Sequence, residues 1–194
     1  QPIATQISKL RFFISLVVDQ KVDKEKPNFG IRALPNLETK FVAANTLIGI
    51  DKPKAQMTLF DNQEIKELEQ ELKNIRHRLF SAKSPATKRR LRDKDKEIRE
   101  KIGKLLVEHG WGNETAKQLA GWDPYDQNAF SPFFDPEWMF DNKDGFNVVI
   151  GNPPYGAAIS PNILERLKTF SPKLFCKETA ILFIEKGRQL LTLN

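Results

Sequence analysis

Cysteine, long apolar runs and a recognisable leader are what this sequence lacks. Cys176 is the only cysteine among the 194 residues, so no disulfide can form within the chain, which suits a reducing cytoplasm. No apolar run approaches the roughly 18 residues of a membrane span. The start, QPIATQISKL, has neither the charged beginning nor the apolar stretch of a secretory signal. We therefore expect a cytoplasmic protein with no membrane partner.

The composition that remains is typical of a folded domain. Hydrophobic residues make up 40% and charged residues 29% of the chain, a balance that favours a packed core over disorder. The net charge of +6 is concentrated, because residues 83–104 hold ten Lys or Arg against four Asp or Glu. Such a stretch suits a polyanion partner, although a solvated helix face is the commoner explanation. The chain starts without a methionine and stops just after a helical pattern, so we expect a piece of a larger protein.

Spacing of apolar residues predicts the elements of the first half. Residues 2–18 carry one apolar helix face, and Pro2 fits the first turn. A polar loop over 19–36 and a short strand over 40–47 are expected to follow. Residues 61–109 hold two runs of coiled-coil-like spacing with a break near Pro85, which predicts two antiparallel helices of about 20 residues each.

The second half has a different character. Residues 111–145 are rich in aromatic residues, Pro and Asp, and we expect an ordered, mostly irregular segment. Residues 146–150, FNVVI, form a continuous apolar run typical of a buried parallel strand, and Asn152-Pro153-Pro154-Tyr155 follows at its carboxyl end. Helices are expected over 161–170 and 177–193. The resulting division has core segments 1–60 and 111–194 with a helical hairpin, 61–110, inserted between them.

Asn152-Pro153-Pro154-Tyr155 has the chemistry to hold a planar amine. The exocyclic amine of adenine is a poor nucleophile because its lone pair is delocalised into the ring. Acceptors on both amino hydrogens localise that lone pair, and an Asn carbonyl with a nearby backbone carbonyl can supply them. Two prolines hold these acceptors rigidly, while the tyrosine ring can stack on a base swung out of the duplex. A rigid turn is the simpler interpretation of the tetrapeptide, but its position after FNVVIG favours the catalytic one.

The sequence GFNVVIGNPPYG resembles the catalytic loop of gamma-class adenine-N6 DNA methyltransferases. The wider stretch WDPYDQNAFSPFFDPEWMFDNKDGFNVVIGNPPYG resembles the fused restriction–modification enzymes of type IIG, and QPIATQISKLRFFISL and LPNLETKFVAANTL resemble segments near their cofactor site. The resemblance implies double-stranded DNA as substrate and S-adenosylmethionine as methyl donor. It implies an α/β fold, an incomplete Rossmann-like methyltransferase domain that is helix-rich and carries an inserted antiparallel helical hairpin. The rest of the parent polypeptide is then a partner of this chain.

Site residues follow from the same resemblance. Asn152, Pro153, Pro154 and Tyr155 are implied to be catalytic, with Asn152 and the Pro153 carbonyl on the amine and Tyr155 on the base. Asn45 stands where the family often has an aspartate that bonds the cofactor's adenine, and Thr46 where relatives carry an apolar ring. The glycine-rich cofactor loop and the ribose-binding carboxylate are not found in the chain. We therefore expect residues 1–194 alone to bind the cofactor weakly or not at all, and to be inactive.

Two other functions stay open at this point. A protein glutamine methyltransferase also uses the motif NPPY, since an amide nitrogen poses the same problem, and a non-catalytic helical interaction module would need no chemistry. The basic helix over 86–104 could follow DNA phosphates or could be a solvated face. No metal site is expected, because His77 and His109 lack further ligands at suitable spacing. The sequences Glu64-Ile65-Lys66 and Glu71-Leu72-Lys73 match part of a nuclease signature without its strand context, so we expect no nuclease site.

Overall fold

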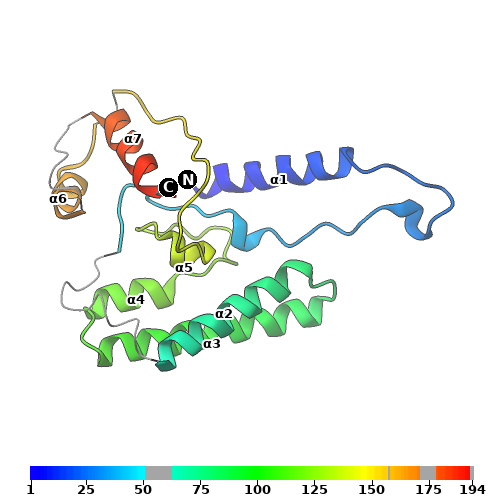
Figure 1. Cartoon of the computed structure of the whole chain (residues 1–194), viewed down its shortest axis with the longest axis horizontal. Helices are drawn as coiled ribbons and strands as arrows, with labels where there is room; N and C mark the ends of the chain where they lie inside the picture. Colours follow the sequence, from blue (N-terminus) through cyan, green and yellow to red (C-terminus); the bar gives the residue numbers. More distant parts are fainter. Residues whose placement is uncertain (51–62, 157, 171–177, 193–194) are drawn as a thin grey trace. The chain divides into compact units, whose positions relative to one another are not determined.

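The computed structural model describes residues 1–50, 63–156, 158–170 and 178–192 (Figure 1). Cys176 lies outside these residues. Helices dominate: α1 (Pro2–Val18), η1 (Pro27–Gly30), η2 (Glu38–Lys40), α2 (Gln63–Ser81), α3 (Pro85–Glu108), α4 (Asn113–Gly121), α5 (Pro136–Phe140), α6 (Pro161–Phe170) and α7 (Thr179–Leu190). The described residues contain two isolated parallel bridges, Ala44 with Ser131 and Phe146 with Leu191, and no longer strand. None of the described helices is both long and apolar enough to cross a bilayer.

The chain divides into two compact units. The first unit comprises Gln1–Ala43 and Lys52–Phe130, and the second comprises Ala44–Asp51 and Ser131–Asn194. The division cuts through the aromatic segment 111–145 at Ser131. The arrangement expected from composition, with an inserted hairpin between two core segments, stays a prediction.

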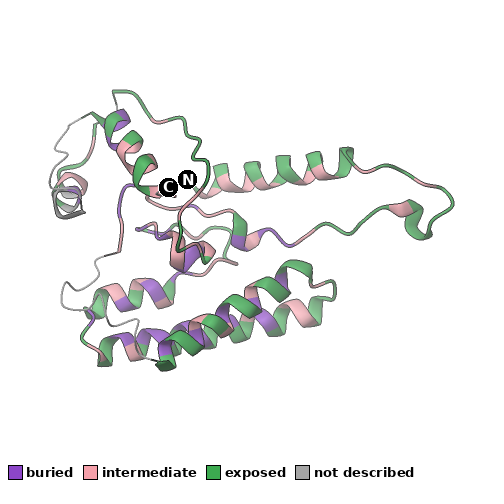
Figure 2. Ribbon diagram, viewed as in Figure 1, coloured by how far each residue is buried: buried purple, intermediate pink, exposed green. Residues whose placement is uncertain are grey.

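Helices α2 and α3 form the core of the first unit and pack as an antiparallel pair joined by residues 82–84 (Figure 1). The seams of the two helices face one another and are buried (Figure 2): Ile65, Leu68, Leu72, Ile75 and Leu79 on α2, and Leu91, Ile98, Ile102 and Leu106 on α3. The sequence predicts all of them except Leu106, because its spacing places Leu105 in the seam, and Leu105 is only half-buried. The N-terminus of α3 is capped by Ser84, whose Oγ accepts a hydrogen bond from the Thr87 amide at 3.1 Å. The predicted pair of helices is confirmed.

The C-terminal end of α2 is capped by a residue from far away in the chain. The Asn36 side-chain amide donates to the carbonyls of Leu79 at 2.7 Å and Ala82 at 2.8 Å, and the Asn36 backbone amide donates to the Phe80 carbonyl at 3.0 Å. The last carbonyls of a helix have no partner inside it, so a buried donor there stabilises the end. The segment before η2 is therefore fixed to the hairpin.

Helix α4 packs against α3 because a glycine allows the two backbones to approach. A Cβ on Gly103 would lie 2.7 Å from the Ala120 Cβ, closer than real Cβ atoms come. Ala116 and Leu119 of α4 are buried, as is Trp111 in the turn between the helices. Helices α2, α3 and α4 of the first unit thus pack together, and the hairpin does not stand alone.

A buried ionic cluster joins α2, α3 and the segment after α4. Asp95 is fully buried and accepts hydrogen bonds from Arg76 Nε at 3.0 Å, Arg99 Nε at 2.7 Å and Tyr125 Oη at 2.8 Å. Arg99 also donates to the Ala120 and Trp122 carbonyls at 2.7 and 2.8 Å. Because each charge has partners, the cost of burying it is offset. Burial and the Asp95 carboxylate raise the pKa of the Tyr125 hydroxyl far above its ordinary range.

Helix α1 begins and ends where the sequence predicts, but none of its residues is buried. Its apolar face is 52–66% exposed: Ile3, Ile7, Leu10, Ile14 and Val17. Within the first unit, Phe12 meets Phe41 edge to face with ring centroids 5.9 Å apart, and the Gln6 side chain donates to the Gln127 carbonyl at 2.9 Å. The helix therefore has a small anchor and a long uncovered apolar side.

The second unit has a small core built around one parallel bridge. The Asn45 amide donates to the Ser131 carbonyl at 2.9 Å, and the Phe134 amide donates to the Ile48 carbonyl at 2.7 Å. Ile48, Ser131 and Phe133 are buried there. The strand expected over 40–47 is thus reduced to one bridged residue followed by a turn.

The buried strand expected over 146–150 is wrong for the described structure. Only Phe146 is paired, while Val148 is 69% exposed and Ile150 is 91% exposed. An apolar run in extended backbone becomes buried only when strands flank it and helices cover both faces of the sheet. The described part of the chain provides no flanking strand for residues 147–150, so these side chains stay open to solvent.

Candidate catalytic loop

The segment that leads into the loop is anchored to the end of α7. The Phe146 amide donates to the Leu190 carbonyl at 2.8 Å, and the Thr192 amide donates to the Phe146 carbonyl at 3.1 Å. Gly145 has φ +90°, and a Cβ there would lie 2.9–3.0 Å from backbone atoms of Leu190, Leu191 and Thr192. Only glycine fits this close approach.

Upstream of the anchor, a turn fixes the direction of the chain. Helix α5 is capped by Asp135, whose Oδ1 accepts from the Trp138 amide at 2.8 Å, and it ends at Asp141 in the left-handed region. Asn142 Oδ1 then accepts from the Gly145 amide at 3.0 Å. The rings of Phe134, Phe140 and Phe146 follow one another with centroids 6.0 and 6.4 Å apart. The loop thus starts from an ordered base.

Beyond Phe146 the chain forms neither helix nor strand up to Gly156, and it approaches α7 at Val149. Gly187 of α7 faces Val149, since a Cβ on the glycine would lie 3.5 Å from Val149 Cγ1. Next on the helix, Lys186 is half-buried, and burial lowers the pKa of its ammonium while the Asp135 carboxylate opposes that shift. Sequence reasoning did not single out Lys186 or the Gly145 anchor. The signals were a lone lysine in the apolar stretch TAILFIEKG and a glycine directly before FNVVI.

The four residues of the candidate catalytic motif follow as an open loop without helix or strand. Asn152, Pro154 and Tyr155 are exposed, Tyr155 to 80%, and Pro153 is half-buried. Gly156 has φ +65° and ends the loop in a conformation that L side chains rarely adopt. Within the described residues, no protein group hydrogen-bonds the Asn152 amide. Its carbonyl is therefore available as an acceptor for an amine.

The two candidate cofactor residues lie in the same unit as this loop. Asn45 and Thr46 are half-buried in the turn that follows the Ala44 bridge. The Asn45 backbone is held by Ser131 and Ile48, but its side-chain amide has no hydrogen-bond partner among the described residues. Within that same part of the chain, no hydrogen bond links Asn45 or Thr46 to residues 152–155. The structure thus places both segments without joining them directly.

Comparison with known proteins gives a family. The model of the family described as Eco57I restriction-modification methylase matches residues 1–194. The chain belongs to this family. It is a methylase of the restriction–modification type, a DNA methyltransferase, and methylases of this type act on DNA. No curated protein and no solved structure matches it.

Two of the earlier alternatives can now be judged, one from the family and one from the structure. A methylase that acts on DNA leaves a protein glutamine methyltransferase without support, so that alternative is set aside. The two nuclease-like sequences also have ordinary roles in the structure. Glu64 pairs with Lys101 at 3.2 Å, and Glu71 pairs with Lys94. The middle residues of the two tripeptides, Ile65 and Leu72, are buried in the hairpin seam.

Proposed function

We propose that this methylase transfers a methyl group from S-adenosylmethionine to the N6 amine of adenine in double-stranded DNA, as a gamma-class enzyme of type IIG. The observation that carries the proposal is the exposed loop Asn152–Tyr155, whose Asn amide has no hydrogen-bond partner among the described residues and whose aromatic ring is 80% exposed. A stacking ring next to a rigid pair of acceptors suits a base that has left the duplex.

The chemistry that these residues supply is the preparation of a weak nucleophile. The Asn152 carbonyl and the Pro153 carbonyl accept the two hydrogens of the adenine amine, which localises the nitrogen lone pair. The amine attacks the methyl carbon as the carbon–sulfur bond breaks, with its electron pair staying on sulfur, and the nitrogen then loses a proton to water. Tyr155 holds the base plane so that the nitrogen lies in line with the methyl carbon.

The donor set in the chain fits one corner of a cofactor site. S-adenosylmethionine supplies the methyl group on a positively charged sulfur. Asn45 fits its adenine end, because the Asn45 backbone is fixed while its side-chain carbonyl is free to accept from an exocyclic amine. An uncharged acceptor forms a weaker hydrogen bond than the carboxylate that many relatives use. Thr46 lies next to it, and together they bind only this end of the molecule.

We also infer that the loop belongs to an α/β, Rossmann-like methyltransferase domain. The support is the uncovered apolar run after Phe146, where Ile150 is 91% exposed, and the uncovered face of α1. In a doubly wound fold, strands flank such a run and helices cover it. The rest of the parent polypeptide is the proposed source of these strands, and it also carries the glycine-rich cofactor loop.

Substitution of Asn152 tests the proposed function. In the complete enzyme, Asn152→Ala should lower N6-methyladenine formation in DNA by about 10²-fold or more, because one positioned acceptor is lost. Asn147→Ala is the matched control, since Asn147 is an exposed asparagine of the same segment, and its activity should stay within a few-fold of wild type. The readout is mass spectrometry of hydrolysed DNA. Undiminished methylation by Asn152→Ala points to a non-catalytic interaction module, and methylcytosine as the product refutes the choice of adenine.

A further inference from the structure

The tip of the α2–α3 hairpin is basic without any counter-charge in its own sequence. Residues 72–92 contain eight Lys or Arg and no Asp or Glu. This stretch includes the last two turns of α2, the connection 82–84 and the first two turns of α3. Helix α3 also has no acidic residue in its first turn, where one would ordinarily stabilise the helix.

The cations of the hairpin fall into two groups by their partners. Toward its base they are neutralised, because Lys94 pairs with Glu71 and Lys101 pairs with Glu64 across the helices. Arg76 and Arg92 reach Asp95 and Glu38, at 3.0 and 2.9 Å. Five cations of the tip, in contrast, form no ion pair within the described part of the chain: Arg78, Lys83, Lys88, Arg89 and Arg90.

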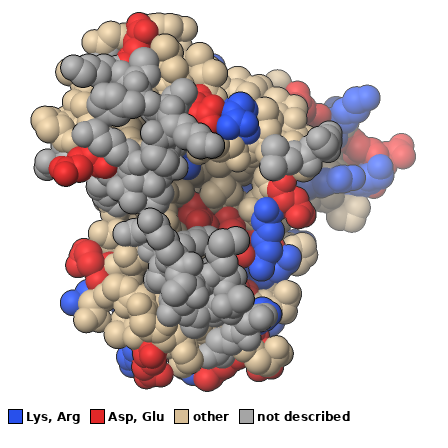
Figure 3. All heavy atoms as spheres, turned by 60° about the vertical axis from the view of Figure 1, so that its left-hand side comes forward, with Lys and Arg blue, Asp and Glu red and all other residues tan. Residues whose placement is uncertain are grey.

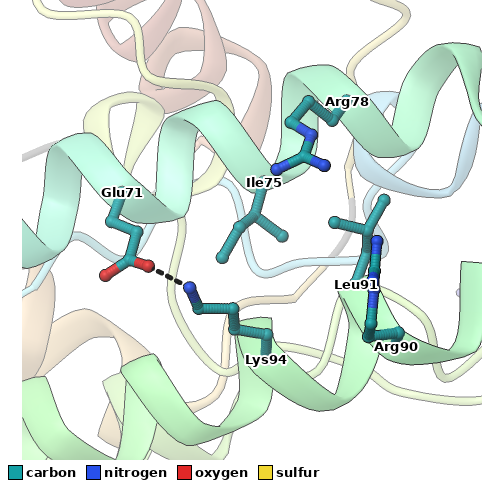
Figure 4. Close-up of a pocket in the computed structure, with 6 residues that line it drawn as sticks. All are labelled: Glu71, Ile75, Arg78, Arg90, Leu91 and Lys94. Atoms are coloured by element: carbon teal, nitrogen blue, oxygen red, sulfur yellow. Dashed lines mark ion pairs between the residues drawn. The ribbon is translucent and has the colours of Figure 1, made fainter. Parts of the chain in front are cut away.

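Two of these unpaired cations line a groove of about 370 Å³ between the helices. Figure 4 shows Arg78 from α2 and Arg90 from α3 toward one end of the groove with Leu91 beside them, while Ile75 lies between Arg78 and the pair of Glu71 and Lys94. Lys94 turns away from the arginines toward Glu71. The groove therefore has an apolar floor, a neutralised pair at one end and, at the other, two guanidinium groups that form no ion pair with any residue the structure describes.

An anion is the ligand that this arrangement fits. The positive charges of Arg78 and Arg90 repel each other, and a negatively charged group bound between them is attracted by both, which offsets that repulsion. Guanidinium is weakly hydrated and presents a planar fork that matches phosphate oxygens. The face drawn in Figure 3 is different, since Lys and Arg side chains intermingle there with Asp and Glu. The sequence of the hairpin tip, in contrast, has eight Lys or Arg and no Asp or Glu over residues 72–92.

We infer that the hairpin tip binds the DNA backbone, with Arg78 and Arg90 contacting phosphate oxygens in the groove and Lys88 and Arg89 adding to the attraction. This inference rests on the proposed function, because DNA is the polyanion that the methylase must hold. The contacts fix the position of the duplex and carry no sequence information. In this arrangement the apolar floor of Ile75 and Leu91 lies under the phosphates.

The experiment measures how salt weakens DNA binding by the complete enzyme. The variant Arg78→Gln/Arg90→Gln removes two phosphate contacts. The plot of the logarithm of the association constant against the logarithm of salt concentration should therefore become less steep by about 1.8. Affinity for a fluorescent duplex of random sequence should fall by about 10–100-fold at about 0.1 M salt. The charge-preserving variant Arg78→Lys/Arg90→Lys should keep most of the slope. Melting curves of each variant report whether the hairpin still folds.

Two lysines of α3 serve as the matched control. Lys96→Gln/Lys101→Gln removes the same net charge, but these lysines already pair with Glu100 and Glu64. We expect it to leave the slope within about 0.5 of wild type. An unchanged slope in the arginine variant, or an equal change in both variants, overturns the inference. Either result leaves the Asn152 test of methyl transfer untouched, and failure of that test leaves the salt slope readable.

Discussion

The α2–α3 hairpin and the Asn152–Tyr155 loop differ in how far each is completed by its own residues. In the hairpin, the apolar seams are buried and the one buried carboxylate, Asp95, has three donors. In the loop, the chain is anchored at Phe146 and is then exposed up to Tyr155 except at the half-buried Pro153. The hairpin therefore buries its apolar residues and pairs its buried charges with its own neighbours, while most of the loop lies exposed on the surface.

The difference follows from the range over which each element finds its partners. Helices satisfy their backbone groups within the element, and the seams of α2 and α3 meet after a connection of only residues 82–84. A parallel strand finds its hydrogen bonds and its cover in segments distant in sequence. Mutations in the hairpin interior should thus lower the stability of the whole hairpin. In the loop, the largest effect should come from mutations at the anchor around Phe146.

The largest effect on stability is expected at Asp95. Replacing it with asparagine removes the buried carboxylate that Arg76 and Arg99 share and leaves the more distant Asp123, 3.7 Å from Arg99, as a counter-charge, which should lower the free energy of unfolding of the first unit by about 3–5 kcal/mol. Urea unfolding followed by helical circular dichroism measures this. Asp93→Asn, at an exposed position of α3, should change it by less than about 0.5 kcal/mol. Equal effects of the two variants would refute the role of the buried cluster.

Gly145→Ala tests the anchor of the loop. A Cβ there would lie 2.9–3.0 Å from backbone atoms of Leu190 and Thr192, and the residue would have to keep a φ of +90°. The free energy needed to open the anchor should therefore fall by about 3 kcal/mol. Hydrogen exchange of the Phe146 and Thr192 amides should become about 100-fold faster. Gly151→Ala is the control, because a Cβ on Gly151 has open space around it. Unchanged exchange in Gly145→Ala would mean that the anchor does not hold the loop.

The Tyr125 hydroxyl should make the stability of the hairpin depend on pH in the alkaline range. Tyr125→Phe removes the hydrogen bond to Asp95, at a cost of about 2 kcal/mol at neutral pH. The pKa of Tyr125 is raised in the folded state, so the stability that its proton contributes is fully present below the unfolded pKa of about 10 and is lost as pH rises above it. Wild type and variant should therefore converge in stability above about pH 10. A difference that stays constant with pH would contradict this coupling.

The smallest effect is expected from an ion pair on the surface of the same helix. Lys96 and Glu100 approach to 4.0 Å with both side chains more than half exposed. Glu100→Gln should change the free energy of unfolding by less than about 0.5 kcal/mol. An effect near that of Asp95→Asn would show that burial is not what separates the two kinds of ion pair.

The sequence predicted the helices far better than it predicted the surroundings of the site. The 3.6-residue periodicity of Ile65 to Leu79 and the start of α1 at Pro2 are local signals, and both are confirmed. The buried strand over 146–150 was wrong because burial depends on neighbours that the run itself does not encode. The cluster around Asp95 was missed since its members come from positions 76, 95, 99 and 125, with no spacing that marks them. The roles of Asn45, Thr46 and the NPPY residues stay predictions.

The cap that Asn36 places on α2 has a consequence for anyone who edits this protein. The hairpin has the sequence pattern of a cassette that could be cut out and replaced by a short linker. Its removal would take away the carbonyls of Leu79 and Ala82 and leave the Asn36 amide, only 8% exposed, without acceptors. The segment that runs from Asn36 toward Asn45 would lose its fixed starting point. A shortened enzyme therefore needs a new acceptor for Asn36, or an apolar residue in its place, before the deletion can be tolerated.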